Sequence, residues 1–207
     1  MKQEIRDRIT EVHKFYWEEV RKATIQCENL IGDLPDPVYI EVRNGFDHIA
    51  RVEAGSLPEE KASETLTLGV EHFKRSIVDA WEIMTVFLSD KINNVINNLE
   101  TSIPARASRG SFYFKLFEAQ KLAIGLMNEA REMKALKYDL ARENFQKAFN
   151  ILEKALKEFF GAPSLQEYLV KRDKESSRNR KIDFIIYFIL GIITGVIATL
   201  ITRCIIK

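Results

Sequence analysis

Residues 59–99 read EEKASETLTLGVEHFKRSIVDAWEIMTVFLSDKINNVINNL, and this stretch decides the fold. Its apolar side chains recur every three or four residues, the spacing that places them on one face of an α-helix. We expect a helix that begins near Glu59 or Ser63 and runs to about Leu99. The stripe that it would bury consists of Phe73, Ile77, Trp81, Met84, Leu88, Ile92, Val95 and Leu99.

Similar stripes flank this long helix on both sides, and turn residues separate them. Gly32 is expected to end the first helix, with Asp36 as a candidate N-cap and Pro37 at the first position of the second. The segment IPARASRGS, residues 103–111, interrupts the pattern. Because no β-type alternation appears, we predict an all-α, antiparallel bundle of about five helices within residues 1–162. The predicted helices cover residues 3–31, 37–54, 59–99, 111–136 and 138–160.

Composition restricts the function classes. The 207 residues carry a formal charge of +1, but residues 171–207 contain 8 Lys and Arg against 3 Asp and Glu. The remainder is therefore mildly acidic, with 23 basic and 27 acidic residues, which argues against broad electrostatic binding of nucleic acid. Cys27 and Cys204 have neither the spacing of a metal site nor that of a disulfide framework, so no cofactor or metal is expected.

A membrane anchor is expected at the C-terminal end. FIIYFILGIITGVIATLI, residues 184–201, contains no charge over 18 positions and lies within a predicted transmembrane helix of residues 182–204. A basic polar linker or juxtamembrane helix, residues 163–181, precedes it. The positive-inside bias then predicts a single-pass anchor with a cytoplasmic N-terminal domain, and Gly191 and Gly195 have the GxxxG spacing of a dimerising helix. The basic residues before the span are Lys171, Arg172, Lys174, Arg178, Arg180 and Lys181, against Arg203 and Lys207 after it.

One short motif has the residue types for chemistry. PVYIEVRNGFDHIARVEAG, residues 37–55, contains Arg43, Asn44 and His48. On a helical wheel Tyr39, Val42, Phe46 and Ile49 form an apolar face opposite these polar residues, so we expect His48 and Asn44 to point to solvent or to a partner chain. At i,i+4 spacing Asn44 can hydrogen-bond His48, and Arg43 can pair with Asp47. Glu41, Asp47 and Arg51 are expected to support the site.

The Arg-Asn-x-x-x-His motif on a helical bundle resembles the HEPN superfamily, whose signature is Arg-x(4 to 6)-His with a polar residue after the Arg. The resemblance covers about residues 1–160. It implies a metal-independent endoribonuclease of a defence or toxin type, acting as a homodimer in which the motifs of two protomers meet. Arg43, Asn44 and His48 would then be catalytic, with RNA as substrate and no cofactor.

A second interpretation is a non-catalytic, membrane-tethered helical adaptor that binds a protein partner. Its exposed face would consist of Glu41, Asn44, His48 and Arg51. The two other histidines, His13 and His72, are interpreted as surface or edge residues of the bundle.

Overall fold

In the computed structural model, residues 2–55, 57–100 and 103–161 are described, and within these ranges helices joined by short turns are the sole regular secondary structure. Contacts divide the chain into two compact units, Met1–Lys157 and Glu158–Lys207. The first unit contains the predicted bundle and the motif. The helices are α1 (Gln3–Phe15), a π-helical turn η1 (Tyr16–Val20), α2 (Arg21–Ile31), α3 (Asp36–Glu53), α4 (Glu59–Glu100), α5 (Ile103–Met133) and α6 (Tyr138–Gly161).

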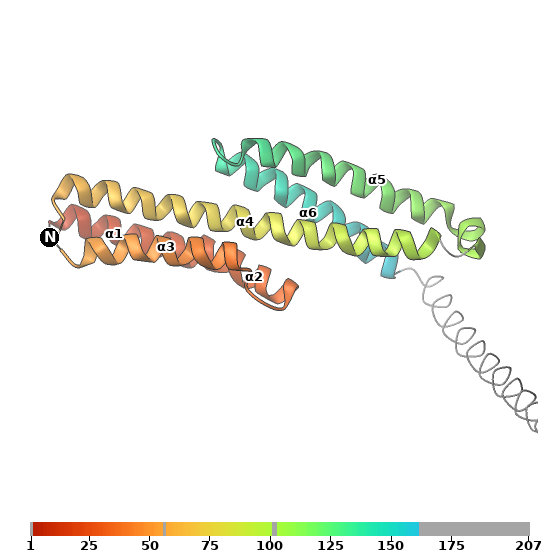
Figure 1. Ribbon diagram of the computed structural model, residues 1–207, viewed down its shortest axis with the longest axis horizontal. Coiled ribbons are helices and arrows are strands. Elements are labelled where there is room, and N and C mark those ends of the chain that lie inside the picture. The colour runs from red at the N-terminus through yellow and green to blue at the C-terminus, as the bar shows by residue number, and fades with distance from the viewer. Residues whose placement is uncertain (1, 56, 101–102, 162–207) are drawn as a thin grey trace, which may run out of the picture. The chain divides into compact units, whose positions relative to one another are not determined.

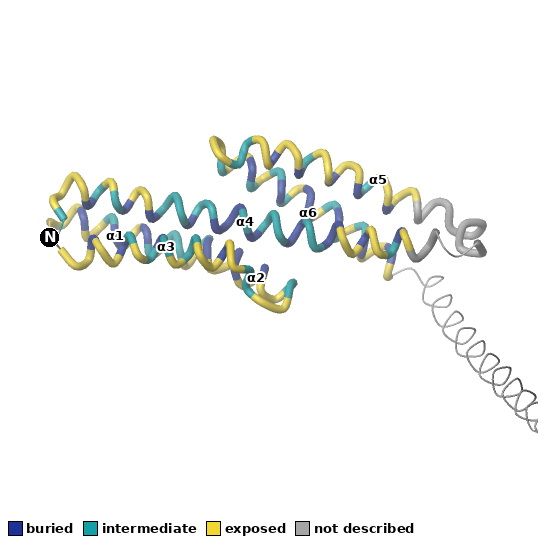
Figure 2. Tube along the Cα trace, in the orientation of Figure 1, coloured by how far each residue is buried: buried dark blue, intermediate teal, exposed yellow. Residues whose placement is uncertain are grey.

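Helix α4 organises the first unit. It has 42 residues, about 63 Å at 1.5 Å per residue, and agrees closely with the predicted helix. Helices α1 and α3 lie along its N-terminal half, whereas α5 and α6 lie along its C-terminal half (Figure 1). Buried residues follow the facing sides of these helices (Figure 2). The described members of the predicted stripe that are buried are Phe73, Ile77, Met84, Leu88 and Ile92.

The two halves of α4 have different cores. In the N-terminal half Phe73 meets the ring of Phe46 at 5.2 Å and that of Tyr16 at 5.5 Å. In the C-terminal half Trp81 packs edge-on against Phe149 of α6 at 5.3 Å. Lys134 also forms ion pairs of 2.6 Å with both Asp79 and Glu82 of α4. Helix α4 therefore contributes one side of both cores.

Two predicted helix starts are wrong. Helix α5 begins at Ile103, not at Ser111, because Pro104 lies in the first helical turn, where no backbone donor is lost, and the alanines and arginines that follow favour helix. Helix α3 begins one residue earlier than predicted, so that Pro35 is the N-cap and Asp36 is already helical. Gly32 does end the preceding helix, as predicted, and lies in the left-handed region at φ 95°.

The predicted buried face of α3 is correct only in part, because Ile49 is buried and Phe46 packs on Phe73, but the face as a whole is rotated. Tyr39 is 52% exposed, whereas the buried residues are Val38, Gly45, Ile49 and Val52. At 100° per residue this face is rotated by about 70° toward His48 relative to the predicted one. Two glycines explain the rotation: a Cβ on Gly69 of α4 would lie only 3.2 Å from the carbonyl oxygen of Gly45.

The contact at Gly45 predicts a destabilising substitution. In Gly45→Ala the new Cβ would lie 2.5 Å from Cδ1 of Phe73 and closer still to its Cε1, inside a packed core. We expect the free energy of unfolding to fall by about 1–3 kcal/mol, the usual cost of overpacking, as measured by denaturant unfolding.

Gly125→Ala provides the matched control, since a Cβ there meets nothing within 4 Å. Removal of glycine from an open helical position should raise stability by about 0.5–1 kcal/mol. Equal effects of the two substitutions would contradict close packing of α3 on α4.

Candidate active site

The structure separates the members of the motif around α3. Arg43 and Asp47 are exposed, whereas Asn44 and His48 are half-buried. His48 lies five positions after Arg43, a rotation of about 140° around the helix. Because the buried face is rotated toward His48, its imidazole lies at the edge of the interface with α4 and does not project freely into solvent. His48 was predicted to point to solvent or to a partner chain; its half-buried ring instead lies against α4 of the same chain.

The two predicted i,i+4 pairs are not formed. Within the described residues, Arg43 makes no ion pair with Asp47, and Asn44 donates no hydrogen bond to His48. What holds the His48 ring is a residue of another helix, since its ring stacks on that of His72 of α4 with centroids 5.2 Å apart and planes 21° apart. Gly69 leaves room for this approach, because a side chain there would touch the Cβ of His48.

The His48 ring is neutral and incompletely hydrogen-bonded. Its Nδ1 is buried without a hydrogen-bond partner, which costs roughly 1–3 kcal/mol for an ordinary polar group. Burial lowers the pKa of His48 below its ordinary value of 6.5, and the nearby His72, Arg51 and Arg75 lower it further, against the opposing effect of Asp47. The ring is thus able to accept a proton at neutral pH.

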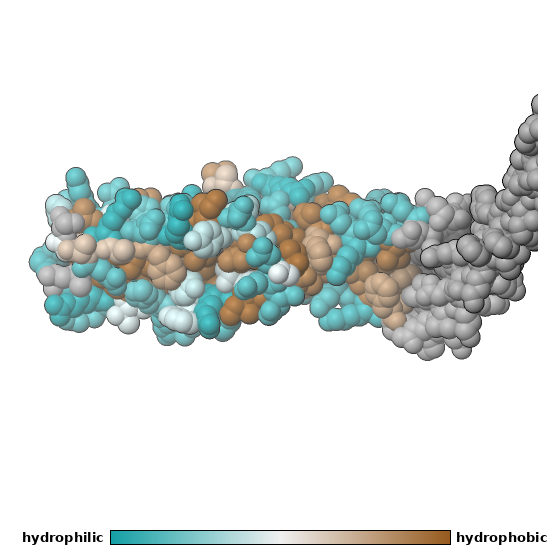
Figure 3. Space-filling model, turned by 60° about the horizontal axis from the view of Figure 1, so that its bottom comes forward, coloured by the Kyte–Doolittle hydropathy of each residue, from teal (hydrophilic) through white to brown (hydrophobic). Residues whose placement is uncertain are grey.

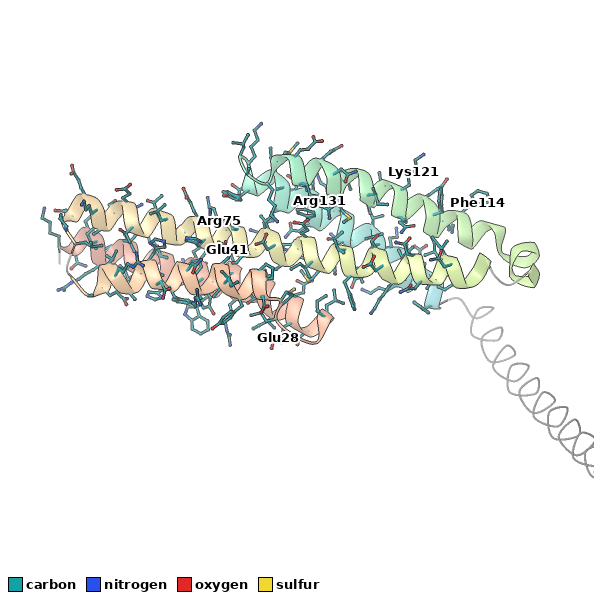
Figure 4. The ribbon with its side chains drawn as sticks, viewed as in Figure 1. Glu28, Glu41, Arg75, Phe114, Lys121 and Arg131 are labelled. Carbon is teal, nitrogen blue, oxygen red and sulfur yellow. The ribbon has the colours of Figure 1, made fainter. Side chains whose placement is uncertain are left out.

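Glu41 links α3 to α4 on the side of α3 that carries His48. Its Oε2 lies 2.7 Å from Nδ1 of His72 and accepts a hydrogen bond of 3.1 Å from Nε of Arg75. Figure 4 shows Glu41 and Arg75 next to each other where α3 meets α4. The side chains of Glu41 and His72 are only 22% and 19% exposed, so solvent screens their contact weakly. We call Glu41, His48, His72 and Arg75 the histidine cluster.

The carboxylate decides the tautomer of His72. Nη2 of Arg75 also approaches Nδ1 of His72, at 3.0 Å, but a guanidinium can only donate. The carboxylate of Glu41 can only accept and lies closer, so Nδ1 of His72 carries the hydrogen. That assignment leaves Nε2 of His72 as the nitrogen available to a ligand, the arrangement found when a carboxylate orients a histidine.

His72 and Arg75 were missed as site residues. Their one sequence signal is the i,i+3 spacing, which places a histidine and an arginine on the same face of a helix. Nothing in the sequence indicates that this face lies opposite Glu41 and His48. Among the predicted supporting residues, Glu41 joins the histidine cluster, Arg51 acts on His48 through its charge, and Asp47 lies on the exposed side.

Other chemistry has little support in the described residues. No three His, Cys, Asp or Glu side chains there are arranged to hold a metal ion. Cys27 is buried in α2, and desolvation raises the pKa of its thiol to about 11, so the reactive thiolate is disfavoured.

Comparison with known proteins returned no match to a protein-family model, to a curated protein or to a solved structure. Within the part of the chain that the structure describes, no helix has the length and apolarity needed to span a membrane. The predicted linker (163–181), transmembrane helix (182–204) and GxxxG pair (Gly191 and Gly195) lie outside the described residues.

The environment of His48 predicts a dependence of stability on pH. Because its pKa in the folded state is below the ordinary 6.5, the unfolded ring binds more protons near pH 6. The stabilisation is complete above the unfolded pKa and falls as the pH drops through it. Between pH 7.5 and 5.5 the unfolding free energy of the wild type should therefore decrease more than that of His48→Gln.

His13→Gln controls for the removal of a histidine outside the histidine cluster. Denaturant unfolding at several pH values gives the slopes, and NMR titration of the ring would locate the pKa directly. Parallel slopes for the wild type and His48→Gln would contradict the burial of a neutral ring.

Proposed function

We propose that the protein is a membrane-anchored, HEPN-like, metal-independent endoribonuclease of a defence or toxin type that acts as a dimer. The observation that carries the proposal is the neutral imidazole of His48, whose buried Nδ1 lacks a partner in a cluster with a second histidine and an arginine. A histidine that served packing alone would be expected to satisfy its buried nitrogen. Unsatisfied, pKa-shifted groups concentrate at functional sites.

The chemistry follows from the residue types. RNA can be cut when its 2′-hydroxyl attacks the adjacent phosphorus, a reaction that needs a proton acceptor and charge stabilisation but no metal. His48, neutral at pH 7, serves as the acceptor. Arg43 stabilises the negative charge that develops on the phosphoryl oxygens, since a guanidinium donates two parallel hydrogen bonds to such a group.

A site formed by two protomers is compatible with the separation of Arg43 from His48 within one chain. Within one chain the two side chains project from different sides of α3, so Arg43 of one protomer can face His48 of the other across an interface. Tyr39 and Ile40, which are exposed and lie about one helical turn before Arg43, supply apolar area for this interface. Figure 3 shows apolar areas interspersed with polar surface.

The anchor of residues 182–204 would strengthen this dimer. Confinement to a membrane raises the local concentration of protomers, and close packing at Gly191 and Gly195 would add contacts between spans. In this arrangement the helical unit lies in the cytoplasm, where RNA is found.

RNA cleavage by the full-length chain in detergent micelles tests the proposal. A labelled RNA mixture is incubated in EDTA with the wild type, His48→Ala and Arg43→Ala. We expect the wild type to cleave and each variant to lose at least about 100-fold in rate, the low end for removing a general base or a charge-stabilising group.

His13→Ala is the matched control, because this histidine lies on α1 and pairs with Glu53 outside the histidine cluster. A strand with 2′-deoxyribose at every position should resist cleavage if the 2′-hydroxyl is the nucleophile. Cleavage by His48→Ala at the wild-type rate would remove His48 from the mechanism.

The exposed apolar residues also favour a second candidate, the membrane-tethered adaptor. Glu41 and His48, two residues of the predicted adaptor face, contact His72 of α4 and are not free to bind a partner. Trp17 and Tyr39, however, are more than half exposed. Aromatic side chains of this kind concentrate in protein interfaces. Absence of RNA cleavage, together with a protein partner that binds the wild type but not Tyr39→Glu, would favour this function.

A further inference from the structure

We propose that His72 is a second catalytic residue, the general acid that protonates the leaving 5′-oxygen, and that Glu41 is its positioning residue. This inference rests on the proposed ribonuclease function and goes beyond the Arg43, Asn44 and His48 motif. It assigns the site to two helices, α3 and α4, whose contact the motif does not reveal. The observations are the stacking of the two imidazoles and the hydrogen bond from His72 to Glu41.

The spacing of the rings suits an in-line displacement at phosphorus. In that reaction the attacking and leaving oxygens lie on opposite sides of the phosphorus, so a base and an acid act on two different oxygens of one phosphate. The His48 and His72 rings are 5.2 Å apart and nearly parallel. Two imidazoles this close can contact the same phosphate, so we assign one of its two oxygens to each ring.

The orientation of the nitrogens agrees with this division. Nδ1 of His48 is enclosed and Nδ1 of His72 is bonded to Glu41, so Nε2 is the nitrogen left for the substrate in both rings. Glu41 is well placed to compensate the positive charge of a doubly protonated His72. His48 has no carboxylate hydrogen bond, so the two rings lie in contrasting environments, as an acid and a base require.

The step balances without any further reactant. His48 takes the proton of the 2′-hydroxyl as the 2′-oxygen bonds to phosphorus, and the bond from phosphorus to the 5′-oxygen breaks. His72 donates its Nε2 proton to that 5′-oxygen, which leaves as a hydroxyl. The products are a 2′,3′-cyclic phosphate end and a 5′-hydroxyl end, and exchange with water restores both histidines.

Several charged groups set the pH dependence of this pair. Glu41, Asp47 and Arg51 approach from α3, and Arg75 approaches from α4. Of these, Glu41 makes the shortest contact with His72. Glu41→Gln would keep a hydrogen-bond acceptor beside Nδ1 but remove the negative charge, so cleavage of a substrate that needs a general acid should slow more than cleavage of an activated ester.

A substrate that needs no acid isolates the role of His72. The full-length wild type, His72→Ala and His48→Ala are compared on an RNA dinucleotide and on uridine 3′-(4-nitrophenyl phosphate), whose leaving group departs without protonation. We expect His72→Ala to lose at least about 100-fold on the dinucleotide but less than about 5-fold on the activated ester, because only the former requires a general acid. His48→Ala should lose activity on both substrates.

The outcomes separate this inference from the function on which it rests. If His48 is required but His72→Ala cleaves the dinucleotide at the wild-type rate, or loses both substrates equally, the assignment of His72 is overturned and the ribonuclease remains. If the folded wild type cleaves neither substrate, the ribonuclease function and this inference both fall. Thermal unfolding of each variant identifies a loss that is due to misfolding, and His72→Gln then replaces His72→Ala.

Discussion

The close approach of α3 to α4 at Gly45 and Gly69 is the constraint on which the rest of the site depends. A Cβ at Gly45 would collide with the Phe73 ring, and a Cβ at Gly69 would lie only 3.2 Å from the carbonyl oxygen of Gly45. Because neither glycine has one, the helices pack with their backbones near each other, and Phe73 fills the space beside Gly45. The same approach brings the His48 ring onto His72 and places Glu41 within hydrogen-bond distance of both His72 and Arg75.

Packing of the aromatic core offsets the free-energy cost of a site that contains a buried nitrogen without a hydrogen-bond partner. A buried nitrogen without a partner costs roughly 1–3 kcal/mol, a substantial fraction of the usual stability of a domain. Tyr16 and Phe46 pack at 4.6 Å, and both contact Phe73, one residue after His72. Burial of large aromatic side chains is among the strongest stabilising contributions available to a small bundle. The site is therefore held on two rigid helices next to a well-packed core.

Structural features that depend on the periodicity of apolar residues could be predicted from the sequence. Features that depend on packing between helices could not. Most of the predicted stripe of α4 is buried because its apolar residues recur at helical spacing, although Trp81 and Val95 are only half-buried. The π-helical turn Tyr16–Val20, which interrupts the first predicted helix, was not predicted. The buried face of α3 could not be predicted, because hydropathy gives weight to Tyr39 and none to Gly45. The stacking of His48 on His72, 24 residues away, depends on that rotation and could not be predicted either.

The length of α4 has a mechanical consequence for the histidine cluster. His72 and Arg75 lie on the turns of α4 directly before Asp79 and Glu82, which form ion pairs with Lys134. A continuous helix bends little over one or two turns. The ion pairs of Asp79 and Glu82 with Lys134 therefore help to fix the direction of the part of α4 that carries His72. Catalytic groups on such a helix keep their geometry more precisely than groups on a loop.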